Sequence, residues 1–127
     1  MKSFQAFFDG HTHQDEYCIY VMSDAEQSLF GAVSPMLWLS RISVEEHKIK
    51  HPEITASDYS IIRDMVKFGQ IYQQGSKRFA LLHQNGITYR AAIKVTQDQQ
   101  KMYLLTVFKT TESKATKEIV QRFKRIR

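Results

Sequence analysis

The stretch "RFALLHQNGITYRAAIKV", residues 78–95, decides the fold of this chain. Its side chains follow a period of two, which is typical of β-strands, whereas the segment before Gly69 follows the helical period. Asn85-Gly86 stands between the two halves, and an Asn-Gly pair between two such runs predicts a two-residue turn. The stretch therefore predicts a β-hairpin.

The hairpin extends in both directions along the chain. "KMYLLTVFKT", residues 101–110, follows a polar turn at residues 96–100 and predicts a third strand. "QIYQQ", residues 70–74, adds an edge strand before the hairpin. Together these segments predict an antiparallel β-meander.

Two short helices are predicted before the meander. Residues 43–46 read S-x-x-E, a capping box that opens a helix, and Pro52 ends that helix because the residue before a proline avoids the helical region. Residues 55–58 give a second start signal, residues 61–66 have helical spacing, and Gly69 is a natural stop. These helices are expected to cover one sheet face and to leave the other partly open.

The two ends of the chain have different patterns. Residues 4–8, 17–22 and 35–39 are strand-like, and Ser23 with Glu26 marks a short helix between the last two strands. The final segment "SKATKEIVQRFKRIR", residues 113–127, predicts a basic amphipathic helix. Its expected apolar face consists of Ala115, Ile119, Phe123 and Ile126.

The fold class that follows is α+β. N-terminal strands and helices precede an antiparallel meander, and a basic C-terminal helix closes the fold. With 127 residues the chain is expected to be a single domain. We divide it into an N-terminal extension (residues 1–35), a core (residues 36–110) and the basic helix (residues 111–127).

Composition indicates the setting and the kind of partner. A single cysteine, Cys18, suits a reducing compartment, and no run approaches the length of a membrane span, so we expect a cytoplasmic protein that makes no membrane contact. Residues 1–42 hold two basic and five acidic residues, whereas residues 43–127 hold 16 basic and eight acidic residues. A basic surface of this kind favours a polyanion such as nucleic acid, although a solvated basic surface is the alternative.

Strand alternation predicts a group of cations on the open sheet face. Arg90 and Lys94 share one side of residues 87–95, opposite the apolar side chains that pack on the helices. If Leu105 and Val107 join the core, Thr106 lies on the side of Arg90 and Lys94, and so does Thr110. Cations and hydroxyls on one surface suit the charge that develops on a phosphate during transfer.

Histidines supply the candidate acid and base. His47 and His51 are four residues apart beside Pro52, and imidazole exchanges protons near neutral pH. His11 and His13 lie in a loop with nearby aspartates, but two ligands with one intervening residue are too few for a metal site. We therefore predict no metal and no other cofactor.

A family pattern connects these segments. "WLSRISVEEHKIKHPEI", "SDYSIIRDMVKFG", "YRAAIKV" and "YLLTVFKT" resemble the phage-associated branch of the barnase–EndoU–colicin–RelE-like nuclease superfamily, over roughly residues 36–110. The resemblance implies a barnase/RelE-like fold and a toxin- or phage-associated ribonuclease that cleaves tRNA or mRNA by attack of the 2′-hydroxyl, without a metal. It also admits a neutralising antitoxin or immunity protein as partner. The catalytic residues that it implies are His47, His51, Arg90, Lys94 and Thr106.

Further basic residues are expected to hold the RNA backbone, and the function has alternatives. Lys109, Thr110, Lys117, Arg122, Lys124 and Arg125 are the predicted RNA-binding residues. The same fold could also serve as a non-catalytic nucleic-acid-binding module. A third alternative is a phage structural or interaction protein, which would dock through its acidic N-terminal third.

Overall fold

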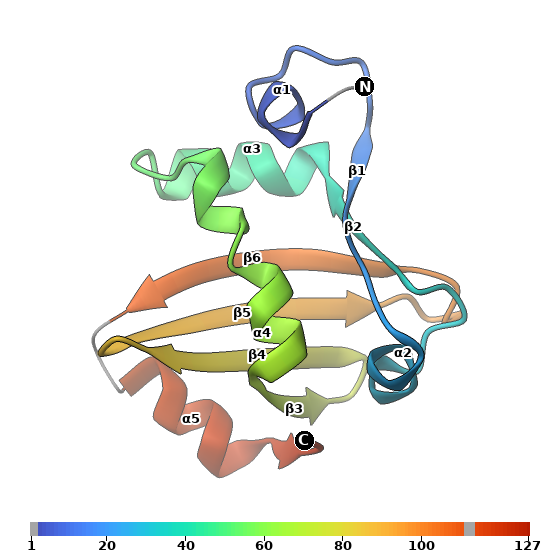
Figure 1. Cartoon of the computed structure of the whole chain (residues 1–127), viewed down its shortest axis with the longest axis vertical. Coiled ribbons are helices and arrows are strands. Elements are labelled where there is room, and N and C mark those ends of the chain that lie inside the picture. Colours follow the sequence, from blue (N-terminus) through green and yellow to red (C-terminus); the bar gives the residue numbers. More distant parts are fainter. Residues whose placement is uncertain (1–2, 111–113) are drawn as a thin grey trace.

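The structure of the chain is a computed structural model that describes residues 3–110 and 114–127. It is an α+β fold in which helices pack on a seven-stranded sheet (Figure 1). In chain order the elements are α1 (Phe4–Phe8), β1 (Glu16–Val21), α2 (Asp24–Phe30), β2 (Met36–Ser40), α3 (Arg41–Lys50), the 3-10 helix η1 (Ala56–Tyr59), α4 (Ile62–Phe68), β3 (Gln70–Gln74), β4 (Lys77–Gln84), β5 (Ile87–Val95), β6 (Met102–Thr110), α5 (Lys114–Arg122) and β7 (Lys124–Arg125).

The sheet has the order β1-β2-β6-β5-β4-β3-β7, and β2 with β6 is the parallel pair among otherwise antiparallel neighbours. The predicted meander is confirmed as β4, β5 and β6. Asn85 and Gly86 both have positive φ, 54° and 75°, as the predicted two-residue hairpin turn requires. β3 is also confirmed as a strand, although β7 pairs along its outer side.

The main core lies on the sheet face that carries α3, η1 and α4. Ala91, Ile93 and Val95 of β5 point into it, as predicted, together with Val44 of α3 and Met65 of α4.

α2 has the predicted capping box, but α3 begins earlier than the S-x-x-E pattern suggested. Ser40 at the end of β2 is its N-cap, because the Ser40 hydroxyl accepts the backbone N–H of Ser43. α3 ends at Lys50, just before His51-Pro52, as predicted.

Two predictions at the N-terminal end have different outcomes. Residues 17–22 were expected to be a strand, which is confirmed as β1, but residues 4–8 form helix α1 and not a strand. Ser3 caps α1, and Phe4, Phe7 and Phe8 have the spacing that puts them on one helical face. The rings of Phe4 and Phe8 contact Tyr59, so the aromatic face of α1 packs on η1.

The C-terminal end also differs from the prediction. α5 stops at Arg122, and residues 124–125 form the short strand β7 along β3. The predicted single helix to residue 127 is therefore wrong. Residues 111–113 lie outside the described part. The Arg127 guanidinium donates to the carbonyl oxygens of Val66 and Gly69. The free edge of β3 and these carbonyls give the last residues hydrogen-bond partners that a continued helix would leave unused.

α5 covers part of the sheet face that was expected to be open. Ile119 is buried against Phe79 and Leu81, and the Phe123 ring stacks on Phe79 with 4.9 Å between the centroids. Figure 1 shows α5 beside β3 and β4 and away from β1 and β2. On β2 and β6, the outward residues Trp38 and Tyr103 are partly exposed and Thr106 is exposed.

A bulge in β6 corrects one assignment in the core. Ala92 pairs with Thr106 but Ile93 pairs with Leu104, so Leu105 is an extra residue in the ladder. Leu104, and not Leu105, is therefore buried, while Val107 is buried as predicted.

Among the residues that the structure describes, no helix is long and apolar enough to cross a bilayer.

Candidate active site

The structure divides the five predicted catalytic residues between the two sheet faces. Arg90 and Lys94 share a face, as predicted, and Thr106 lies on it too because it pairs with Ala92. His47 belongs to α3 and His51 caps its C-terminal end, on the opposite side of the sheet. The five residues therefore do not line one common pocket.

Arg90 serves as a packing residue beneath α5. Its guanidinium carbon lies 5.7 Å from the centre of the Phe79 ring and 5.4 Å from the centre of the Phe108 ring. Burial lowers the pKa of Arg90, and the Glu118 carboxylate of α5 opposes that shift. Lys94 and Thr106 are exposed, and they do not line the pocket that contains the histidines.

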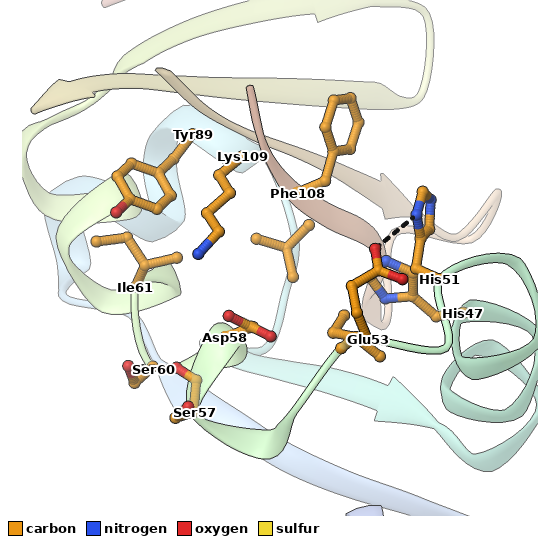
Figure 2. A pocket seen from close by; sticks show the side chains of 12 residues that line it. His47, His51, Glu53, Ser57, Asp58, Ser60, Ile61, Tyr89, Phe108 and Lys109 are labelled. Carbon is orange, nitrogen blue, oxygen red and sulfur yellow. Dashed lines mark hydrogen bonds and ion pairs between the residues drawn. The ribbon is translucent and has the colours of Figure 1, made fainter. Parts of the chain in front are cut away.

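A pocket of about 330 Å³ lies on the helical side, between the end of α3, η1 and the strands β5 and β6 (Figure 2). Both predicted histidines line it, and so do acidic, hydroxyl and aromatic side chains. The lining residues are His47, His51, Glu53, Ile54, Ser57, Asp58, Ser60, Ile61, Tyr89, Val107, Phe108 and Lys109.

His47 forms the inner wall of this pocket. It is 6% exposed, and a 2.7 Å hydrogen bond links its Nδ1 to the Tyr59 hydroxyl. Burial, followed by repulsion from His51, lowers the pKa of His47, so its neutral form is favoured near pH 7. Burial also raises the pKa of Tyr59, which keeps the phenol protonated. His47 is thus held neutral and fixed in place.

His51 stands at the rim, where it is open to solvent. Its side chain is 49% exposed, and its Nδ1 lies 3.5 Å from Glu53 Oε1. The ring meets that of His47 edge to face, with 5.3 Å between the centroids. Because Nδ1 faces a carboxylate, Nε2 is the nitrogen left to exchange a proton with a ligand. Pro52 ends α3 and puts His51 and Glu53 in the short turn that allows this contact.

Lys109 supplies the cation that Arg90 and Lys94 were expected to supply. It lies directly opposite Tyr89 in the β5–β6 ladder, on the face that carries the helices. In Figure 2 its ammonium points into the pocket on the side of Asp58, while His51 and Glu53 stand at the other end. Asp58 is held in place through Oδ2, which accepts the backbone N–H and the hydroxyl of Thr55.

Sequence reasoning missed part of this lining. It assigned Lys109 only to RNA binding, and it did not single out Glu53, Asp58 or Tyr89. The signal for Tyr89 and Lys109 was the alternation of side chains along their strands, which puts both residues on the core side. A lysine on that side at the end of a strand can reach the rim of a pocket. The signal for Glu53 was its position two residues after His51.

The remaining predicted RNA-binding residues lie elsewhere. Lys117, Lys124 and Arg125 are exposed on α5 and β7, and Arg122 makes an ion pair with Glu118. Thr110 pairs with Thr88 at the end of β6, and its side chain lies outside the described part. In residues 3–110 and 114–127, no three His, Cys, Asp or Glu side chains gather as metal ligands, His11 and His13 included.

Comparisons with protein-family models, with curated proteins and with solved structures gave no match. The resemblance to the barnase–EndoU–colicin–RelE-like superfamily therefore remains a prediction. The geometry itself establishes a half-open pocket that combines an oriented, exposed imidazole with an ammonium group and several hydroxyls.

Proposed function

We propose that the chain is a metal-independent ribonuclease of barnase/RelE-like type, and that the pocket of His51 and Lys109 is its active site. The observation that carries the proposal is that one pocket holds a solvent-exposed histidine, oriented by Glu53, together with a lysine. These groups are a base and a phosphate-binding cation, and both promote cleavage of RNA by its own 2′-hydroxyl. A free cysteine at position 18 fits action in the cytoplasm.

In the proposed reaction His51 acts as the general base. The 2′-hydroxyl gives its proton to Nε2 of His51 while the 2′-oxygen attacks the phosphorus. The bond between phosphorus and the 5′-oxygen breaks, which yields a 2′,3′-cyclic phosphate and a 5′-hydroxyl that takes its proton from water. The Lys109 ammonium stabilises the additional negative charge on the phosphorane oxygens.

His47 acts through His51 in this scheme. As a buried neutral ring fixed by Tyr59, it packs against the His51 imidazole and does not itself exchange the proton. Arg90 and Thr106 stand on the other sheet face, so they take no part in the chemistry. Tyr89 gives the pocket an aromatic wall against which a nucleobase can stack.

The proposal is tested by cleavage of total tRNA in EDTA. The unaltered chain is expected to cut, and His51→Asn is expected to lose about 10²–10⁴-fold in rate, the usual contribution of a general base. Lys109→Gln should lose a similar factor. His83→Asn is the matched control, because His83 is an exposed histidine of β4 that contacts Thr88 and does not line the pocket.

The outcomes separate the candidate functions. Intact tRNA after prolonged incubation with the unaltered chain overturns the nuclease proposal. Binding that weakens with salt, but without cleavage, would instead favour a non-catalytic nucleic-acid-binding module. Equal activity in His51→Asn and the unaltered chain would move the active site away from this pocket.

A further inference from the structure

A single row of side chains crosses the sheet on the face opposite the pocket. Trp38 of β2 lies beside Tyr103 of β6, Tyr103 lies opposite Lys94 of β5, and Lys94 lies opposite Lys77 of β4. Residues directly opposite one another in neighbouring strands point to the same side of the sheet. We call Trp38, Tyr103, Lys94 and Lys77 the aromatic–lysine row.

The row is accessible to solvent. The adjacent residues Leu37 and Met102 are buried in the main core, so Trp38 and Tyr103 point away from it and are partly exposed. Lys94 and Lys77 are both exposed. α5 packs on the neighbouring residues Phe79 and Leu81 and leaves the row uncovered.

The two lysines form an unfavourable pair in the absence of a ligand. Like charges directly opposite each other in antiparallel strands destabilise a sheet. In the described part of the chain, neither Lys77 nor Lys94 has a carboxylate within ion-pair distance. An anion lying across both ammonium groups would remove the repulsion.

A polar cluster packs against the two aromatic rings. The Lys101 ammonium lies 5.2 Å from the centre of the Trp38 ring and 5.7 Å from that of Tyr103. It bonds Glu16 at 2.5 Å, and the Tyr103 hydroxyl donates to the other Glu16 oxygen at 2.9 Å. The positive charge of Lys101 is thereby balanced by Glu16. The unbalanced positive charge of the row belongs to Lys77 and Lys94.

We propose that the aromatic–lysine row binds single-stranded RNA, with bases stacking on Trp38 and Tyr103 and phosphates lying over Lys94 and Lys77. Neighbouring strands are spaced so that the row runs about 14 Å from Trp38 to Lys77. Aromatic rings can stack on the bases of a single strand, and cations further along the same line can bind its phosphates. An acidic protein segment would use the lysines, but unlike RNA it does not carry a flat ring on every unit of its chain to stack on the two aromatics.

This binding is separate from the proposed catalysis, since the pocket lies on the other sheet face. A probe that cannot be cleaved keeps the two apart. We choose a labelled 2′-O-methyl oligouridine about eight nucleotides long, which falls within the site sizes of single-strand-binding modules. It lacks the 2′-hydroxyl nucleophile, so it stays intact whatever the pocket does.

Trp38 is the single tryptophan of the chain, so its fluorescence reports on this row directly. Titration with the oligouridine at low salt is expected to quench Trp38, because a stacked base lies on its ring. Polyphosphate, which carries the charges without the bases, should compete for the site without the same quenching.

Variants give the second measurement, by fluorescence anisotropy of the label. Lys77→Gln with Lys94→Gln should weaken binding about tenfold or more and lower the salt slope by about two. Trp38→Ala should weaken it by about tenfold. Lys67→Gln, an exposed lysine of α4, is the matched control and should bind as the unaltered chain does.

Absence of quenching at low salt, or equal binding by the double lysine variant and the control, would overturn the inference. So would polyphosphate that quenches as strongly as the oligouridine. Quenching by the oligouridine in a chain that cuts no RNA would support this row while the pocket proposal fails.

Discussion

The His47 imidazole and the Tyr59 hydroxyl form a buried hydrogen bond of 2.7 Å that joins α3 to η1. Both residues are buried, and burial disfavours a charged His47 ring. It connects the stability of the fold to the pocket, because both elements also carry pocket residues.

The first prediction concerns pH. The folded-state pKa of His47 lies below its unfolded value of about 6.5, so protonation favours the unfolded chain. Its contribution to stability is complete above about pH 6.5 and is lost as the pH falls through the lowered folded value. Urea titrations between about pH 7.5 and 5 should show a falling free energy of unfolding, and His47→Gln should flatten this dependence. An unchanged slope in the variant would contradict the prediction.

The second prediction concerns the hydrogen bond itself. Tyr59→Phe leaves the buried Nδ1 of His47 without its partner and should lower the free energy of unfolding by about 1–3 kcal/mol. Urea denaturation measures the loss. In a chain that already carries His47→Leu, the same change should cost less, because there is no imidazole left unsatisfied. If Tyr59→Phe lowered the free energy of unfolding equally in the unaltered chain and in the His47→Leu chain, the His47–Tyr59 hydrogen bond would contribute nothing to stability.

The third prediction concerns Gly69, where α4 turns into β3. A Cβ at this position would collide with the carbonyl oxygen of Met65 and would lie 2.7 Å from that of Leu81. Both are backbone atoms, so Gly69→Ala should lower the free energy of unfolding by about 3 kcal/mol or prevent folding. Gly75→Ala is the control: its Cβ meets no atom within 4 Å, and only its positive φ makes alanine unfavourable. A smaller loss at Gly69 than at Gly75 would contradict the structure.

The fourth prediction follows from the opposed lysines. Lys94→Glu replaces repulsion from Lys77 with attraction, so it should raise the free energy of unfolding by about 0.5 kcal/mol at low salt. The gain should shrink in about 1 M salt, where exposed charges are screened. Thermal melts at both salt concentrations measure it. A variant that is less stable at low salt would show that the two ammonium groups are not close enough to repel.

Much of the sheet could be predicted from local sequence. Asn85-Gly86 and the period-two runs on either side led to the meander, because turn chemistry and strand alternation act over a few residues. Strand parity also placed Arg90 and Lys94 on one face correctly. The same reasoning failed at residues 4–8, where the Ser3 cap and the packing of three phenylalanines on η1 and β1 favour a helix.

The position of the site could not be predicted in the same way, because it depends on contacts between distant segments. α5 covers Phe79 and Leu81 across the sheet, and no local pattern fixes which strands a terminal helix will cover. The pocket forms where the turn after α3 meets the end of β6, and this puts Lys109 in the same pocket as two histidines that are more than fifty residues away in sequence. His51 was predicted as a catalytic residue from the sequence, but its partners became apparent only in three dimensions.

The central claim is most directly tested with one RNA in two forms. The unaltered chain, in EDTA, is incubated with a single-stranded RNA and with the same sequence carrying 2′-O-methyl groups, and the ends of the products are identified. We predict that the RNA is cut to fragments with 2′,3′-cyclic phosphate ends, and that the methylated form stays intact. An RNA that is not cut, or a methylated RNA that is cut as fast, would contradict the account.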